Sequence, residues 1–414
     1  MRSPAESTTF RSLRHKNVQK YLGGMAISQI GAWVQFTTVA VVVDRLTEST
    51  TAIGVLTALQ FGPLLVIGAW AGSLSDRVNR HQVVLITQSL MAVQAVLLAL
   101  AHVTGTLTLG LVYVATLMLG IVSALDNPFR RGFLTELVAP DEISNVMSLN
   151  TATMTGSRIF GPAIAALLIG PFGVGWMFLI NAVTSAAIIF SIVGIDRSLV
   201  REPPRVAKGG QPIREAVRFI ARTPLFGSVF AIYTAVSTFG YNHNVALPRI
   251  ADAAWGNRMW FGWIMTATSL GSLIGSLLTA GRPAVTLRWM TANAFVLGIA
   301  GVALAFSPSG PVALIVAVPL GLGGAGFIAS MNSWSQDMCP PEMRGRVLAF
   351  SAVAFLGSYP IGGPITGVIG DSVGLTWSLL YGAVIVLGCA LWLRFRLISS
   401  SIMREPIETS TLSV

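Results

Sequence analysis

Charged side chains are scarce in this chain. Only 11% of its 414 residues are Asp, Glu, Lys or Arg, while 53% are apolar. A soluble globular domain has about 25% charged residues, so this sequence has too little polar material to cover a water-exposed surface of its size. The composition therefore argues strongly against a soluble enzyme.

Residues that bind metals or form disulfides are also few. Cys339 falls in a predicted loop and Cys389 inside an apolar stretch, so no disulfide framework is predicted. The sequence has no Walker A motif, so ATP is not expected to drive the protein directly. A G-x-G-x-x-G pattern at 321–326 lies inside an apolar stretch, where it suits close helix packing. We expect no cofactor and no metal, because the four histidines are scattered: His15, His81, His102 and His243.

Long apolar stretches are abundant. A hydrocarbon core of roughly 30 Å needs about 20 helical residues. Short turns join most of the stretches, so neighbouring helices should be antiparallel. We predict an all-α membrane protein with twelve transmembrane helices, at approximately 21–44, 51–74, 82–104, 107–128, 144–170, 174–195, 224–250, 259–280, 286–306, 311–335, 346–370 and 375–395.

Positive charge is distributed unevenly over the gaps between these stretches. If the basic start of the chain is cytoplasmic, 23 of the 27 Lys and Arg residues fall in gaps on that side. Only Arg45, Arg249 and Arg258 fall on the other side, and Arg158 lies within a stretch. This bias predicts a multi-pass protein of the cell inner (plasma) membrane with both termini in the cytoplasm. The basic loops suit contact with anionic membrane lipids, and their lack of interleaved aromatics argues against nucleic acid.

One gap is long and differs in composition. Residues 196–223 are rich in Pro, Gly and basic residues, and we interpret them as a cytoplasmic linker between two six-helix bundles, 1–195 and 224–414, the second with a cytoplasmic tail. Ile213, Val217 and Ile220 recur at helical spacing there, which suits a short helix at the membrane surface. A weak repeat between 140–143 and 340–343 supports duplicated bundles, which would place a site between them.

Residues 72–81 form the most specific motif. They read Gly-Ser-Leu-Ser-Asp-Arg-Val-Asn-Arg-His, which resembles the G-x-x-x-D-R-x-x-R-[RK] loop of the major facilitator superfamily, except that His81 replaces a basic residue. The stretches 28–35, 127–130, 158–162 and 340–347 resemble the drug and siderophore exporter branch, of which enterobactin exporters are an example. The resemblance extends over nearly the whole chain.

The resemblance implies a conformational latch at the cytoplasmic side. Gly72 would allow close helix approach, and Asp76 would face the positive N-terminus of the 346–370 helix. Arg77 could then pair with Asp126 or Glu136, and Arg80 belongs to the same loop. The alternative interpretation is that the loop only marks topology, which would explain its arginines but not Asp76.

Arg158 is the most informative candidate for substrate binding. It lies about 14 residues, or roughly 21 Å, into its stretch, near the midplane, where an ionised side chain must face protein or water. A structural brace is the alternative. Pro248 is expected to disturb the helix at 241–244, where His243 could titrate. The other candidates, each of which could instead be an interhelical contact, are Gln29, Trp33, Gln35, Tyr241, Asn242, His243 and Tyr359.

These patterns predict a secondary transporter that exports an amphipathic organic compound by alternating access, and the resemblance implies exchange for protons. A lysolipid or lipid flippase of the same fold is one alternative. A membrane-embedded enzyme or receptor is another, disfavoured because the apolar stretches contain no paired acids and no nucleophile-base set. The sequence does not predict the substrate, the coupling ion or the oligomeric state.

Overall fold

The structure, a computed structural model, describes residues 8–75, 77–201 and 218–399, and within these ranges every regular element is helical. The first part of the chain, here called the N-terminal bundle, contains η1 (Thr8–Arg14), α1 (Lys16–Thr47), α2 (Thr50–Ser75), α3 (Arg80–Val103), α4 (Leu109–Glu136), η2 (Pro140–Glu142), α5 (Ile143–Phe172), α6 (Val174–Val193) and η3 (Arg197–Leu199). The second, the C-terminal bundle, contains α8 (Pro224–Gly240), α9 (His243–Ala253), α10 (Met259–Ala280), α11 (Leu287–Ala305), α12 (Gly310–Met338), α13 (Pro341–Leu356), α14 (Tyr359–Ser372) and α15 (Leu375–Ser399).

Side-chain caps fix where several of these helices begin. Asn79 accepts a hydrogen bond from the backbone N–H of Gln82 at the start of α3, and Thr108 and Thr286 cap α4 and α11 in the same way. Such caps satisfy backbone donors that a helix start leaves unpaired. At these three positions the sequence ends the loop with a residue that caps the next membrane helix.

Eleven helical segments in the described residues are long and apolar enough to cross a membrane, one of which runs through α13 and α14 across the short turn at Gly357 and Ser358. The remaining predicted stretch, 224–250, is divided between α8 and α9 by non-helical backbone at Tyr241 and Asn242. The predicted total of twelve therefore stays a prediction, whereas the all-helical membrane fold is confirmed.

The interruption falls within 241–244, where we expected Pro248 to disturb the helix, and Pro248 itself lies inside α9. At the interruption itself, the side-chain amide of Asn242 donates to the carbonyl of Thr238. The backbone of α14 comes so close that a Cβ on Gly362 would lie 1.9 Å from the same carbonyl oxygen. Close packing of α14 and a competing side-chain hydrogen bond therefore coincide with the break.

Helices pack mainly within their own bundle. In the N-terminal bundle α1 packs on α5 and α6, and α3 and α2 pack on α4; in the C-terminal bundle α12 packs on α10 and α11, and α15 on α8 and α11. The largest contacts between the bundles are those of α2 with α14 and of α5 with α10. This grouping agrees with two six-helix units, but the predicted boundaries at 195 and 224 stay predictions, since 202–217 and the two ends of the chain lie outside the described residues.

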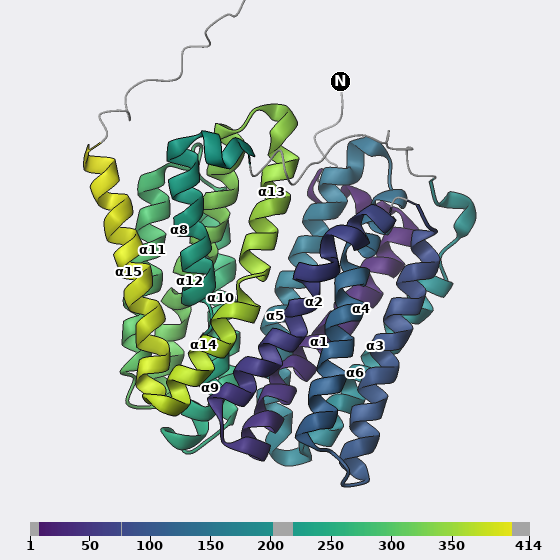
Figure 1. Ribbon diagram of the computed structural model, residues 1–414. Helices are drawn as coiled ribbons and strands as arrows, with labels where there is room; N and C mark the ends of the chain where they lie inside the picture. The colour runs from purple at the N-terminus through teal and green to yellow at the C-terminus, as the bar shows by residue number, and fades with distance from the viewer. Residues whose placement is uncertain (1–7, 76, 202–217, 400–414) are drawn as a thin grey trace, which may run out of the picture.

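The bundles touch mainly at one end. We call the end where α1 begins and α15 ends the terminal face, and the other end the distal face. In Figure 1 the bundles converge toward the distal face, at the bottom, where α14 lies against α2. A Cβ on Gly54 would lie 2.6 Å from the carbonyl oxygen of Gly363, and one on Gly367 would lie 2.6 Å from that of Thr50. Since α13 contacts α2 far less than α14 does, the bundles are closed at the distal face and separated toward the terminal face.

Candidate functional site

Arg158 lies in the middle of α5 and points toward the C-terminal bundle. Its side chain is exposed, although α5 is one of the membrane-spanning helices. The guanidinium carbon lies 5.1 Å from the centre of the Trp33 ring on α1, which is a cation–π contact. Its charge also acts on His243 of α9 and Tyr359 of α14. Because those two residues belong to the C-terminal bundle, solvent reaches Arg158 from between the bundles.

Aromatic rings from both bundles surround Tyr359. The ring centroid of Phe61 on α2 lies 5.0 Å from that of Tyr359, and the centroid of Phe355 on α13 lies 5.7 Å away. Phe355 packs edge-on against Tyr241, whose hydroxyl donates a 2.7 Å hydrogen bond to the carbonyl of Gly324. Phe61 and Phe355 escape sequence-based prediction, because a Phe in an apolar helix carries no local sign of whether it faces lipid or the other bundle.

Two helix interruptions of the C-terminal bundle meet beside this aromatic cluster. Thr238, near the end of α8, donates a 3.1 Å hydrogen bond from its hydroxyl to Ser358, between α13 and α14. Just after the first interruption, His243 Nδ1 and Asn244 Oδ1 are buried without a hydrogen-bond partner among the described residues. Such atoms are rare in native structures, and interrupted membrane helices frequently form substrate sites. Asn242 lies at the same interruption, against Gly362 of α14.

The two glutamines predicted on α1 have different surroundings. Gln29 is half-buried and one helical turn from Trp33, so both lie on the same side of α1. Gln35 is only 2% exposed and sits inside the N-terminal bundle. Its amide donates to Gln94 at 2.9 Å and accepts from Asn181 at 2.8 Å. The candidate binding surface therefore excludes Gln35, whose amide joins three helices.

Ion pairs at the terminal face differ from those we expected. Arg80, not Arg77, pairs with Glu136, at 2.9 Å, and its Nε donates to the carbonyl of Ser75 at the same distance. Asp126 pairs with Arg130, one turn along α4, at 3.3 Å. Asp126 also accepts hydrogen bonds from Thr87 and Gln88 of α3. Arg77 is exposed and enters no ion pair with the described residues, because its position after α2 directs it to solvent.

The rest of the predicted latch is only partly visible. Asp76 lies outside the described residues. Gly72 does not serve close approach, because a Cβ there would have nothing within 4 Å. The close approach of α2 to α4 occurs instead at Gly120, where a Cβ would lie 2.6 Å from the carbonyl oxygen of Gln60. The latch as a mechanism therefore remains a prediction, with Arg80 and Glu136 as its observed pair.

A buried carboxylate anchors the N-terminal segment, here residues 8–15, to the terminal face. The side chain of Glu142, between α4 and α5, has no exposed surface. Arg11, Arg14 and His15 of the N-terminal segment all contact it, Arg11 at 2.9 Å. The segment is thus tied to the start of α5 by three basic side chains.

Salt bridges between the bundles lie at the distal face. Asp44 at the end of α1 has no exposed surface and lies 3.1 Å from the guanidinium of Arg258, just before α10. Glu48 lies 2.9 Å from Arg249 of α9. Asp252 contacts Arg258 as well, and Arg249 at 3.4 Å. The two pairs between the bundles, Asp44 with Arg258 and Glu48 with Arg249, hold the distal face closed, and sequence could not find them because each joins residues more than 200 positions apart.

Asp371 adds a further contact between the bundles at the distal face. It lies near the end of α14 and accepts hydrogen bonds from the backbone N–H groups of Thr50 and Thr51, at 2.8 and 3.0 Å, and from the hydroxyl of Ser49. These donors form the N-terminus of α2, whose partial positive charge attracts a carboxylate. The distal closure therefore combines ion pairs with a helix cap donated by the opposite bundle.

Comparisons with known proteins agree with this architecture. A family model described as transmembrane secretion effector matches residues 7–408. The chain is 27% identical to the multidrug efflux pump Tap of Mycolicibacterium fortuitum, over 76% of this chain and 79% of that protein. It is 24% identical to the enterobactin exporter EntS of Escherichia coli O1:K1 / APEC, over 80% of each chain.

A solved structure shares the arrangement of helices. It is a bacterial homologue of the human lysosomal transporter Spinster in an inward-facing and occupied conformation. It superposes with a TM-score of 0.70 at 16% identity, covering 95% of this chain and 98% of the other. A likeness at that identity concerns the fold alone.

Proposed function

Because the chain belongs to the transmembrane secretion effector family of the major facilitator superfamily, and is thus a multi-pass membrane transporter of small molecules rather than an enzyme, we propose that it exports a neutral or anionic amphipathic organic compound. The observation that supports this most is the exposed guanidinium of Arg158 at mid-depth, facing His243 and Tyr359 of the other bundle.

The position of the carboxylates supports the preference for neutral or anionic compounds. In the described membrane-spanning helices, Asp44 and Asp371 lie at the distal end, and Asp126, Glu136 and Asp337 at the terminal end. A cation near Arg158 would meet repulsion that low-dielectric surroundings strengthen. An anion or a polar neutral group would gain a charge-assisted hydrogen bond and could stack on the aromatic rings nearby.

We further propose that the terminal face is cytoplasmic. The excess of Lys and Arg on that side supports the orientation. With the bundles separated there and closed at the distal face, the structure would then correspond to an inward-facing state, ready to take substrate from the cytoplasm. The membrane would be the cell inner membrane.

Cysteine labelling tests the orientation. Lys208→Cys and Thr104→Cys, each in a chain with Cys339→Ser and Cys389→Ser, are exposed to an impermeant thiol reagent on intact cells. Thr104 is exposed at the distal end of α3, so it should be labelled and Lys208→Cys should not. Labelling of Lys208→Cys without labelling of Thr104→Cys would show that the orientation is the opposite of the one proposed.

Flux of two matched dyes tests the substrate preference. Carboxyfluorescein is anionic and rhodamine 123 cationic, on the same xanthene ring system. In everted vesicles Arg158→Ala should reduce carboxyfluorescein uptake about 10- to 100-fold, the equivalent of a charged hydrogen bond of about 1.5–3 kcal/mol. Arg158→Lys should be intermediate, since it keeps the charge but loses the planar fork.

Two controls make this flux experiment decisive. Lys16→Ala removes an exposed positive charge from the terminal end of α1 and should leave uptake unchanged. Strong rhodamine transport that survives Arg158→Ala would make Arg158 a structural brace. A lipid-reporter scrambling assay on the same vesicles distinguishes export from flippase activity.

We propose that proton entry drives export. In everted vesicles, carboxyfluorescein uptake should stop when a protonophore collapses an imposed pH gradient, and a substrate pulse should alkalinise the acidified lumen. Uptake that persists at full rate without any gradient of protons would exclude proton antiport, while leaving export itself intact.

A further inference from the structure

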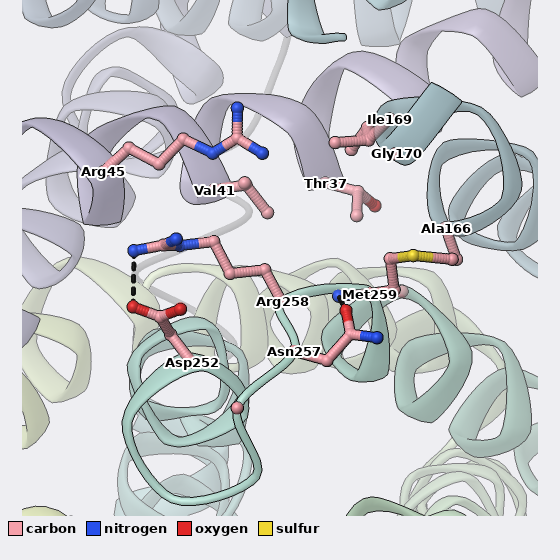
Figure 2. Close-up of a pocket in the computed structure, with 12 residues that line it drawn as sticks. Thr37, Val41, Arg45, Ala166, Ile169, Gly170, Asp252, Asn257, Arg258 and Met259 are labelled. Atoms are coloured by element: carbon pink, nitrogen blue, oxygen red, sulfur yellow. Dashed lines mark hydrogen bonds and ion pairs between the residues drawn. The ribbon is translucent and has the colours of Figure 1, made fainter. Parts of the chain in front are cut away.

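A cavity lies between the bundles at the distal face, apart from the Arg158 site. It has a volume of about 250 Å³ and is bounded by α1, α5 and the loop from α9 to α10. Figure 2 shows Arg45 reaching toward it from α1, and Arg258 from the opposite bundle. Thr37, Asn257 and Met259 also line it. The cavity is smaller than the pockets of roughly 300–1,000 Å³ that hold a drug-sized molecule, so it suits a small organic acid or one charged end of a larger compound.

The unpaired charge in this cavity is positive. Arg258 is shared between Asp44 and Asp252, both carboxylates of the distal closure. Arg45, in contrast, is exposed and enters no ion pair within the described ranges. The side-chain oxygen of Asn257 accepts from the backbone N–H of Met259, so its amide N–H groups are what it can offer a ligand. Arg45 and the Asn257 amide therefore offer a ligand hydrogen-bond donors, beside the Asp252 carboxylate, which also lines the cavity and contacts Arg249 and Arg258 through one oxygen.

Helix geometry connects this cavity with the mid-depth site. On α1, Trp33, Thr37, Val41 and Arg45 follow one another at intervals of four residues, so they form one continuous stripe that winds about 120° around the helix. From Trp33 to Arg45 the rise is about 18 Å. Trp33 contacts Arg158 at one end of this stripe, and the cavity begins at Thr37.

A matching stripe runs along α5. Arg158, Pro162, Ala166 and Gly170 are also spaced by four residues, and the last two line the distal cavity. Between the two sites α10 closes on this stripe, because a Cβ on Gly262 would lie 2.7 Å from the Cβ of Ala166 and 2.8 Å from the carbonyl oxygen of Pro162. The two sites are therefore neighbours along the same two stripes of residues, separated by one tight contact between helices.

We propose that the distal cavity is a second binding site, in which Arg45 holds the carboxylate of an organic anion during release. The inference rests on the proposed export of neutral or anionic compounds and adds a second guanidinium further along the same path. A guanidinium offers a carboxylate two parallel N–H donors, and separation of α10 from α5 at Gly262 would join the two sites.

Reaction rates of charged thiol reagents test the charge of this cavity without requiring transport. Met259→Cys, in a chain without the native cysteines, is treated with the anionic 2-sulfonatoethyl and the cationic 2-(trimethylammonium)ethyl methanethiosulfonate. The ratio of the anionic to the cationic reaction rate should be on the order of tenfold higher at Met259→Cys than at the exposed control Thr104→Cys. Arg45→Gln should remove most of this preference, and Arg45→Lys should retain it. Thr37→Cys serves as a second reporter if Met259→Cys does not fold.

Protection by a ligand tests binding itself. Carboxyfluorescein should slow the modification of Met259→Cys by both reagents, rhodamine 123 should not, and Arg45→Gln should abolish the protection. A reagent preference that is unchanged by Arg45→Gln would mean that Arg45 faces only lipid headgroups and solvent, and would overturn the proposal. Preference without protection would also overturn it, because the cavity would then attract anions without binding them. Loss of dye flux in Arg158→Ala is measured separately, so a failure of the proposed export function can be distinguished from a failure of the second binding site.

Discussion

Replacing Arg258 by Gln is expected to open the distal face. Asp44 has no exposed surface, and the guanidinium of Arg258 lies 3.1 Å from its carboxylate. Gln keeps a polar side chain but removes the positive charge, which leaves Asp44 buried without its ion-pair partner while the face is closed. When the bundles separate there, water hydrates Asp44. The free-energy cost of the unpaired carboxylate therefore destabilises only the closed state.

The size of the effect follows from burial. Removing one partner of a buried ion pair destabilises the state that contains the pair by about 3–5 kcal/mol. The Arg258 side chain is 28% exposed, so the lower end applies. About 3 kcal/mol is roughly a 150-fold change in an equilibrium constant, so a protein that is closed about 99% of the time would become about 60% open at this face.

Glu48→Gln is the matched control. It breaks the second pair between the bundles, Glu48 with Arg249 at 2.9 Å, but the Glu48 side chain is 68% exposed. Exposed pairs contribute about 0–1 kcal/mol, so this variant should change the equilibrium less than about fivefold.

The measurement is the distance between spin labels at Val103→Cys and Phe306→Cys, exposed residues at the distal ends of α3 and α11, by double electron–electron resonance in nanodiscs. Arg258→Gln should add a population with a longer distance. Asp44→Asn combined with Arg258→Gln should return toward the wild-type distribution, because no buried charge remains. An unchanged distribution in Arg258→Gln, or an equal shift in Glu48→Gln, would refute the reasoning.

Three further outcomes are expected. Gly262→Ala should increase the same long-distance population, because its Cβ would lie 2.7 Å from a side-chain carbon of α5, whereas Gly156→Ala, with nothing within 4 Å, should not. Glu142→Gln should lower the midpoint of thermal unfolding of the purified protein by several degrees more than Asp141→Asn, because Glu142 is fully buried and Asp141 is 61% exposed. Gln35→Leu should lower that midpoint while leaving the ratio of carboxyfluorescein to rhodamine flux unchanged, and a changed ratio would return Gln35 to the binding surface.

Sequence alone determined the class of this protein and the course of its helices. Hydrophobicity is a property that sums along a segment, so twelve stretches could be located without knowing what each contacts. Eleven of them correspond to segments able to span a membrane, one of which turns at Gly357 and Ser358 between α13 and α14, and the remaining one is interrupted at Tyr241 and Asn242. The depth of Arg158 also followed from counting, since the rise per helical residue is fixed.

Tertiary structure alone decided which side chains meet. The rotation of each helix and its offset against its neighbours depend on packing over the whole bundle, so residues similar in sequence have different partners. Arg80 rather than Arg77 reaches Glu136, and Gln35 is bound between helices while Gln29 lies on the same side of α1 as Trp33. The distal closure is the clearest case. Asp44 and Arg258 are separated by 214 positions in the chain, and only the contact of two bundles makes them an ion pair.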